Sequence, residues 1–178
     1  GLGGEVLKKV GGTPINLPGG EIFTALQSGT IDATEWVGPY NDLAFGLHKA
    51  AKYYYFPGWH EPGTALEITV NKKAFDKLPN DLQAIVENAA RVANQDMLDE
   101  YTARNNASLI ELTTKHNVEI RQFPKDVLEK LQVISESAVK EIADSDPAIA
   151  KVYDSYKEFR DGVIQYHEVS EKAYINAR

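Results

Sequence analysis

The sequence has no cysteine among its 178 residues. This absence excludes disulfide bonds, zinc sites made of thiolates and catalysis by a cysteine nucleophile. Long apolar runs are missing too, since no stretch approaches the roughly 20 residues that a membrane-spanning helix needs. No secretory signal is recognisable, but the chain begins with Gly1 rather than Met. We therefore expect a processed protein or a fragment, and the missing signal says little about the compartment.

Basic residues are outnumbered by acidic ones. The chain has 19 Lys and Arg against 26 Asp and Glu, which gives a formal net charge of −7. The basic residues are scattered along the chain and form no local patch. Nucleic acids and anionic membranes both require a basic surface, so we expect neither as a partner. The composition, 43% hydrophobic and 25% charged, is typical of a folded globular protein.

Motifs of the common enzyme classes are also absent. None of the four histidines has another histidine three or four positions away, so the sequence contains no helical metal-binding pair. The Gly-rich segments GLGGEV and LPGGEI lack the spacing of a nucleotide-binding loop, and no G-x-S-x-G motif is present. The sequence therefore offers little support for an enzyme of these classes.

The first seventy residues alternate short apolar segments with short helical patterns. The segments expected to be helical are residues 4–10, 19–29 and 39–50, and those expected to be strands are residues 13–17, 31–37, 52–56 and 65–70. Strands that alternate with helices at this spacing predict an α/β fold whose mostly parallel sheet is covered by helices.

The remainder of the sequence is strongly helical. Apolar residues recur at helical spacing from Leu82 to about Lys115, a run far longer than the mean helix of about 11–12 residues. The segment VEIRQF, residues 118–123, is expected to be one more strand. Asp146 is a plausible cap for a last helix at residues 147–176.

This last helix is rich in aromatic residues, and a bend is expected at Gly162. Two interpretations of its apolar rings are open. The helix either packs across its own domain or contacts a second subunit, since a long terminal helix with apolar rings suits an oligomer contact.

Two stretches place a carboxylate and a tryptophan beside a Gly/Pro turn: DATEWVGPYNDL at residues 32–43 and PGWHEPGTALEITV at residues 57–70. Along the strand expected at residues 31–37, Glu35 shares one face with apolar residues, near the carboxyl end of the strand. Ligands of open α/β sheets bind at this end. An ionised carboxylate among apolar neighbours needs a partner. Hard ions such as Na⁺, Ca²⁺ or Mg²⁺ suit carboxylate and carbonyl oxygens.

Glu61 repeats this situation in the turn after the strand at residues 52–56. If the two strand ends are neighbours, Glu35 and Glu61 can share one ion, whereas two close carboxylates without a cation repel each other. The alternative interpretation is that both glutamates face solvent at loop ends and that the tryptophans belong to the core.

The sequence resembles a known family most closely in two segments, PGGEIFTALQSGTIDATEW (residues 18–36) and KYYYFPGWHEPGTALEITVNKKAFDKLPNDLQAIV (residues 52–86). They are similar to the substrate-binding subunits of tripartite ATP-independent periplasmic (TRAP) transporters, and among these to the binding proteins for 2-oxo acids and other monocarboxylates. The resemblance covers essentially the whole chain, which corresponds to the C-terminal half, or slightly more, of such a protein. It implies two α/β lobes that close over an anionic ligand.

By this resemblance, residues 1–61 belong to the second lobe. Residues 62–100 form a crossing strand and the long helix of the first lobe, and residues 101–178 return to the second lobe and add the C-terminal helices. The expected fold is therefore α/β, a periplasmic-binding-protein-like lobe with a mostly parallel sheet plus long C-terminal helices.

The resemblance also implies a site. In the 2-oxo-acid branch a metal ion, Na⁺ or Ca²⁺ here, bridges the protein and the substrate carboxylate, and the matching ligand positions are Glu35, Trp36 through its backbone carbonyl, and Glu61. The ring of Trp36 would also form a wall of the pocket. The substrate-binding candidates are Glu35, Trp36, Tyr40, Asn41 and Phe23. For the last three, helix capping or core packing is the alternative. The arginine that clamps the substrate in this family falls before Gly1, so we expect weak or no substrate binding by an isolated chain that begins there.

The function implied by the resemblance is that of a periplasmic capture subunit, not an enzyme. It binds a small organic carboxylate and delivers it to the TRAP membrane permease subunits. A homodimer through the C-terminal helix is a further expectation. One alternative is a metal-assisted enzyme that uses Glu35 or Glu61 as a general base. Another is an interaction module built on the terminal helices.

Overall fold

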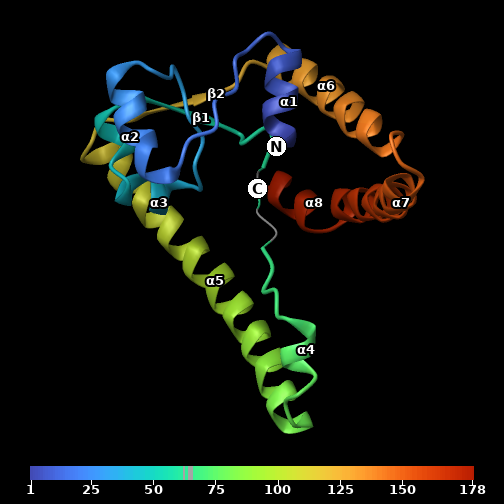
Figure 1. The fold of residues 1–178 in the computed structure, drawn as a ribbon. Coiled ribbons are helices and arrows are strands. Elements are labelled where there is room, and N and C mark those ends of the chain that lie inside the picture. Colours follow the sequence, from blue (N-terminus) through green and yellow to red (C-terminus); the bar gives the residue numbers. More distant parts are fainter. Residues whose placement is uncertain (62, 64–65) are drawn as a thin grey trace. The chain divides into compact units, whose positions relative to one another are not determined.

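The structure is a computed structural model that describes residues 1–61, 63 and 66–178. This part of the chain is rich in helix and has two short strands (Figure 1). The elements in chain order are α1 (Leu2–Lys9), α2 (Gly19–Ser28), α3 (Pro39–Ala44), the 3-10 helix η1 (Leu47–Lys49), β1 (Tyr53–Phe56), α4 (Lys72–Phe75), α5 (Asn80–Thr114), β2 (Glu119–Gln122), α6 (Lys125–Ala143), α7 (Pro147–Val169) and α8 (Glu171–Asn176). None of the helices in these described residues is both long enough and apolar enough to cross a membrane.

The chain forms two compact units. We call Ile15–Pro124 the central unit and Gly1–Pro14 together with Lys125–Arg178 the terminal unit. All six residues predicted to form the site lie in the central unit.

The sheet of the central unit consists of β1 and β2, which pair in parallel with Tyr53 opposite Glu119 and Phe56 opposite Gln122. Tyrosine, phenylalanine and isoleucine favour this pleated arrangement. Two parallel strands need a long crossover connection, which here contains α4 and α5. The predicted strands at residues 52–56 and 118–123 and the predicted parallel pairing are therefore confirmed.

Three other predicted strands are wrong. Residues 13–17, 31–37 and 66–70 form no strand, while residue 65 lies outside the described residues. Their apolar patterns resemble those of strands, but a strand also needs a neighbour for its backbone N–H and C=O groups. No described segment other than β1 and β2 forms such a pair.

The helix predicted at residues 39–50 is divided into α3 and η1. Gly46 between them has φ of 72°, a left-handed conformation that ends a helix and that glycine adopts without strain. The long helix α5 is confirmed with 35 residues. Its C-terminal half packs on α3 and buries Ser108 and Leu112.

The terminal unit is helical. In it α1 packs on α6, and the ion pair of Lys9 with Glu141 joins these helices with a distance of 2.7 Å between Nζ and Oε2. The cap predicted at Asp146 is confirmed, because its Oδ1 accepts a hydrogen bond of 2.6 Å from the N–H of Ala148. The last helix runs through Gly162 and is interrupted at Ser170, so the single helix predicted for residues 147–176 is wrong at that point.

Replacement of Asp146 by Ala tests the cap. The variant leaves a first-turn N–H of α7 without its acceptor and should lower the free energy of unfolding by about 0.5–2 kcal/mol. Urea unfolding followed by circular dichroism measures this. Asp154→Ala, at an exposed position inside the same helix, is the control and should not destabilise the protein. Equal loss of stability in both variants would contradict the assignment of the cap.

Candidate functional site

The structure brings the two tryptophan-containing stretches together. Glu35 lies in the loop between α2 and α3, and its Oε2 is 3.7 Å from Nε2 of His60, the residue before Glu61. The stretch after β1 therefore lies beside the loop that carries Glu35. The side chain of Glu35 is 65% exposed, and Glu61 is exposed as well. Both carboxylates remain open to a ligand from solvent.

The ring of Trp36 is held from two sides. Its centroid lies 4.8 Å from that of Phe45, which directly follows α3. On the other side it touches the start of α2, because a Cβ added to Gly19 would lie 2.7 Å from Cη2 of Trp36. This close approach needs glycine at that position. The indole Nε1 is buried and has no hydrogen-bond partner among the described residues, so a donor is left for another group.

Tyr40 and Asn41 occupy the first turn of α3. The backbone N–H of Tyr40 donates to Oδ1 of Asn105 on α5 at 3.0 Å, and its ring meets Tyr101 edge-on with centroids 6.0 Å apart. The Oδ1 of Asn41 is buried without a hydrogen-bond partner in the described part of the chain. Phe23 is partly buried on α2. Helix α5 therefore holds the backbone of Tyr40, while Oδ1 of Asn41 is left as an unused acceptor among the described residues.

Asp42 is an element of this region that the sequence reasoning missed. It is only 7% exposed. Its Oδ1 accepts hydrogen bonds of 3.3 Å from the N–H groups of Val37 and Gly38, and its Oδ2 accepts one of 2.5 Å from the hydroxyl of Tyr54. Asp42 thus ties the loop after Trp36 to β1. The available signal was an acidic residue in the first turn of a helix, where carboxylates reach back to free N–H groups.

Burial dominates the protonation behaviour of this pair. Loss of water raises the pKa of Asp42, and its hydrogen bonds from Tyr54, Val37 and Gly38 lower it in part. Burial and the bond to Asp42 raise the pKa of Tyr54 far above its usual range. The hydroxyl of Tyr54 therefore remains a donor at all physiological pH values.

A metal ion fits the chemistry of the predicted ligands. Glu35, Glu61 and the carbonyl of Trp36 offer oxygen atoms alone, which suit Na⁺ or Ca²⁺ rather than zinc or copper. No group of three or more His, Cys, Asp or Glu side chains in the described residues could hold a metal. The predicted ligand set has only two acidic side chains besides a backbone oxygen, so the absence of a larger group from the described residues does not test it. The cation site stays a prediction.

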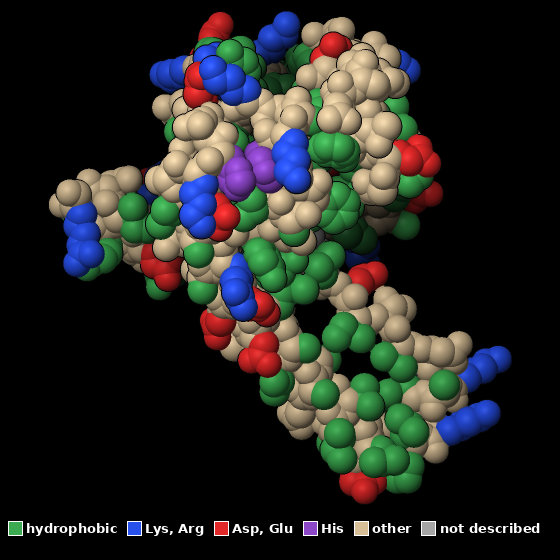
Figure 2. All heavy atoms as spheres, turned by 90° about the vertical axis from the view of Figure 1, so that its left-hand side faces the viewer, with side chains coloured by type: hydrophobic (Ala, Val, Ile, Leu, Met, Phe, Trp, Pro, Cys, Tyr) green, Lys and Arg blue, Asp and Glu red, His purple; other side chains and the backbone are tan. Residues whose placement is uncertain are grey.

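A second cluster consists of two imidazoles. The rings of His48 and His116 lie against each other with centroids 4.1 Å apart and a tilt of 36°, and Nε2 of His116 lies 3.7 Å from Oε1 of Glu111. Figure 2 shows histidine side chains side by side on one face of the molecule. Burial, followed by the positive charges of His116 and Lys49, lowers the pKa of His48. Within the described residues, these two histidines and Glu111 do not form a group that could hold a metal ion.

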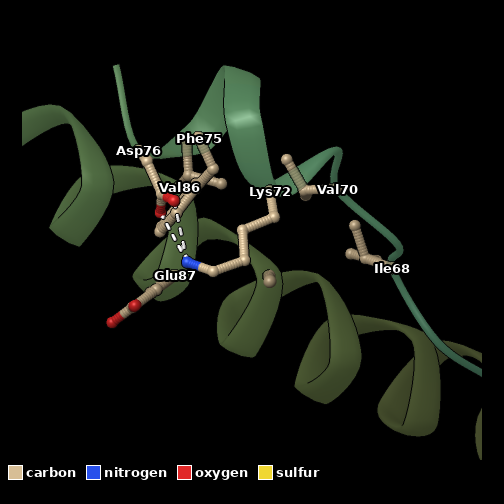
Figure 3. Close-up of a pocket in the computed structure, with 8 residues that line it drawn as sticks. Ile68, Val70, Lys72, Phe75, Asp76, Val86 and Glu87 are labelled. Carbon is tan, nitrogen blue, oxygen red and sulfur yellow. Dashed lines mark hydrogen bonds and ion pairs between the residues drawn. The ribbon is translucent and has the colours of Figure 1, made fainter. Parts of the chain in front are cut away.

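A cavity of about 380 Å³ lies between α4 and the start of α5 (Figure 3). Its walls include Val70, Phe75 and Val86. Lys72 and Asp76 also line it and pair along α4 with a distance of 2.8 Å between Nζ and Oδ2. None of the predicted site residues lines this cavity. The lysine of this lining is already paired and the other charged lining residue, Glu87, is acidic, so the lining offers no unpaired cation to a small anion.

Residues 1–146 match the family described as bacterial extracellular solute-binding protein, family 7 (DctP). A monocarboxylate 2-oxoacid-binding periplasmic protein of Nostoc sp. is 41% identical over 176 residues, which are 99% of this chain and 48% of that protein. The predicted family is therefore confirmed.

Three solved structures are similar over the whole chain. A TRAP periplasmic solute-binding protein from Colwellia psychrerythraea with bound calcium and pyruvate is 41% identical, with a TM-score of 0.95 over 100% of this chain and 54% of its own. The protein from Pseudoalteromonas atlantica, with sodium and pyruvate, has 41% identity and a TM-score of 0.93 over 100% and 54%. The protein from Bordetella bronchiseptica, a dimer with calcium and picolinate, has 37% identity and a TM-score of 0.93 over 99% and 52%. These matches confirm the predicted fold class. The chain spans about half the length of the proteins that it matches.

The contact between Gly19 and Trp36 can be tested with alanine. Gly19→Ala places a methyl group within 2.7 Å of the indole, so the ring must move. Such overpacking should lower the free energy of unfolding by about 1–3 kcal/mol and shift the tryptophan emission. Gly20→Ala is the matched control, because nothing lies within 4 Å of its added Cβ. If Gly19→Ala is as stable as Gly20→Ala, with unchanged emission, the ring is not held at this position.

Proposed function

This chain belongs to family 7 of the bacterial extracellular solute-binding proteins, and on that premise we propose that the protein containing it is the periplasmic subunit of a TRAP transporter that captures a small 2-oxo monocarboxylate through a bridging cation. The subunit closes over the anion and delivers it to the membrane permease subunits. No covalent bond is made or broken. The metal-assisted enzyme is set aside, because the family and the matched relatives are solute-binding proteins.

The names of the similar proteins support the ligand class. The Nostoc relative is named for monocarboxylate 2-oxoacids, and two of the similar structures hold pyruvate. The ions in these structures, calcium and sodium, are the two expected from the family resemblance, and both are among the hard ions that suit the predicted oxygen ligands. A cation also removes the electrostatic objection to an acidic protein that binds an anion, since the ion becomes the largest local charge in the site.

The contact of 3.7 Å between Glu35 and His60 is the observation that carries the proposal. It places the two carboxylate-bearing stretches, far apart in the sequence, in one region of the central unit. In the proposed site Glu35, Glu61 and the carbonyl of Trp36 hold the cation. A cation in that site would also offset the repulsion between the two carboxylates.

Two unpaired buried atoms support a polar ligand next to the cation. They are Nε1 of Trp36, a donor, and Oδ1 of Asn41, an acceptor, and neither has a partner among the described residues. Leaving such a group unpaired costs about 1–3 kcal/mol, which a bound ligand or water recovers. We assign Trp36, Asn41 and Tyr40 to the substrate pocket, with Phe23 as an apolar wall.

The assignment of the chain to lobes is part of the same proposal. Residues 1–61 belong to the second lobe, residues 62–100 to the first, and residues 101–178 to the second lobe and the C-terminal helices. The exposed apolar side chains of Leu66, Ile68 and Ile85 support the placement of the middle segment, because they lack a cover within the described residues. Hydrophobic side chains also gather over α4 and the start of α5 in Figure 2.

Glutamine replacements test the cation site in the complete protein. Glu35→Gln and Glu61→Gln keep the shape of each side chain but remove the charge that a hard cation needs. Each should weaken Ca²⁺ binding at least about tenfold, and weaken pyruvate binding measured in the presence of Ca²⁺, because the ion bridges protein and anion.

Isothermal titration calorimetry with Ca²⁺, and then with pyruvate, measures both effects. Glu67→Gln is the control, because Glu67 is an exposed carboxylate on the segment that follows, and it should bind like the wild type. Wild-type Ca²⁺ and pyruvate affinities in both site variants would refute the site. If pyruvate is converted to another compound during the titration, the metal-assisted enzyme becomes the better interpretation.

We also propose that the protein forms a homodimer through α7. Apolar residues follow one another on this helix at alternating spacings of three and four, which gives a seam of the coiled-coil type. The seam comprises Ile149, Val152, Tyr156, Phe159, Val163 and Tyr166. Of these, Val152 is 71% and Phe159 is 70% exposed. The similar structure from Bordetella bronchiseptica is described as a dimer.

A charge in the centre of the seam tests the dimer. Phe159→Glu puts carboxylates into an apolar contact, so the complete protein should sediment as a monomer at concentrations at which the wild type is a dimer. Glu158→Gln, at the neighbouring position, should leave the dimer intact. A monomeric wild type, or a dimeric Phe159→Glu variant, would show that the seam packs within its own chain or elsewhere.

A further inference from the structure

The peptide group between Trp36 and Val37 joins the proposed cation site to Asp42. Its N–H, which belongs to Val37, donates to Oδ1 of Asp42 at 3.3 Å. Its C=O is the carbonyl of Trp36, the predicted backbone ligand. In a trans peptide group the N–H and the C=O lie in one plane and point in opposite directions. The residue that holds the N–H therefore also sets the direction of the carbonyl oxygen.

We propose that Asp42 is a positioning residue of the cation site, which directs the carbonyl of Trp36 by holding the N–H of the same peptide group. This inference rests on the proposed function. Asp42 also holds the N–H of Gly38, likewise at 3.3 Å, so two successive peptide groups are fixed by one oxygen atom. A single hydrogen bond leaves a peptide plane free to rock, whereas two on consecutive groups restrict it.

The other carboxylate oxygen of Asp42 is fastened to the sheet. Tyr54, in β1, donates its hydroxyl to Oδ2 at 2.5 Å. Strand β1 leads directly into the turn that carries Glu61, the third predicted ligand. Asp42 and Tyr54 therefore connect the loop of Glu35 and Trp36 to the strand before Glu61. Both halves of the proposed site are attached to β1, and we expect this common attachment to fix the distance between them.

Asp42 itself is not a ligand of the cation. It is 7% exposed, and both of its oxygen atoms accept hydrogen bonds from the protein. The loop is also held from α5, where Asn105 accepts from the N–H of Tyr40 and lies against Gly38. The carbonyl of Trp36 is thus presented by a backbone segment that is restrained on both sides. Such outer groups commonly change metal affinity about 10–100-fold when they are replaced.

Three variants of the complete protein separate positioning from folding. Tyr54→Phe removes only the hydroxyl that fastens Asp42. Asp42→Ala removes all the hydrogen bonds that the carboxylate of Asp42 accepts. Asp42→Asn keeps an acceptor for the two N–H groups and can donate to the oxygen of Tyr54. The matched control is Tyr53→Phe, since Tyr53 is 47% exposed on the same strand and its ring lies under Arg121, 3.7 Å from the guanidinium carbon.

Calorimetric titration with Ca²⁺ alone gives the readout, and thermal melts without and with Ca²⁺ report on folding. We expect Asp42→Ala to weaken Ca²⁺ binding about tenfold or more, Tyr54→Phe to weaken it by a smaller factor, and Asp42→Asn to lie nearest to the wild type. The rise in melting temperature caused by Ca²⁺ should shrink in the same order, and Tyr53→Phe should match the wild type. If Asp42→Ala does not fold, Tyr54→Phe and Asp42→Asn still give the ranking.

The outcomes distinguish this inference from the proposed function. If the wild type binds Ca²⁺ and pyruvate but Tyr54→Phe and the folded Asp42 variants bind Ca²⁺ equally well, the positioning role is wrong and the cation site stands. Variants with lower melting temperatures but unchanged Ca²⁺ affinity also overturn it, because they show a purely structural role. If the wild type binds neither Ca²⁺ nor Na⁺, the proposed function fails first.

Discussion

The buried carboxylate of Asp42 is the constraint on which the candidate site depends. It accepts hydrogen bonds from two consecutive backbone N–H groups, at Val37 and Gly38, and from the hydroxyl of Tyr54. Burial of a carboxylate is unfavourable, and it is tolerated here because each oxygen has a donor. The loop after Trp36 is not part of a strand, so these bonds replace the ladder that would otherwise hold it. An irregular segment thereby acquires a fixed backbone at the point where a backbone oxygen is proposed to bind an ion.

The proposed site combines this fixed backbone with exposed acidic side chains. The side chain of Glu35 lies next to His60 and is 65% exposed, so solvent reaches its carboxylate. A rigid carbonyl and adaptable carboxylates suit Ca²⁺ or Na⁺, which accept variable coordination by oxygen. Trp36 is proposed to contribute its carbonyl as a ligand and its ring, which is held between Gly19 and Phe45, as a wall. Trp36 and Asn41 each have a buried polar atom without a partner among the described residues, and we propose that these atoms face the bound anion or a water molecule beside it.

The sequence predicted what depends on local periodicity and missed what depends on long-range partners. Helix α5 and the cap at Asp146 follow from spacing and from residue type, and both are confirmed. Three predicted strands fail because a strand exists only with a neighbour, and residues 13–17 have none among the described residues. The proximity of Glu35 to the turn after β1 was predicted conditionally, as a consequence of adjacent strand ends. The structure places the two segments together, although the loop of Glu35 forms no strand. Asp42 was missed because its partner Tyr54 is distant in sequence and is visible only once β1 is in place.

The central claim is that Glu35, Glu61 and the carbonyl of Trp36 hold one cation that bridges to a small carboxylate. A crystal structure of the complete protein grown with Ca²⁺ and pyruvate, with anomalous differences used to locate the calcium, tests it most directly. The account predicts one calcium peak at about 2.3–2.6 Å from oxygen atoms of all three residues, with the pyruvate carboxylate on its open side. A calcium or pyruvate site elsewhere, with the oxygens of Glu35 and Glu61 directed away from each other, would contradict it.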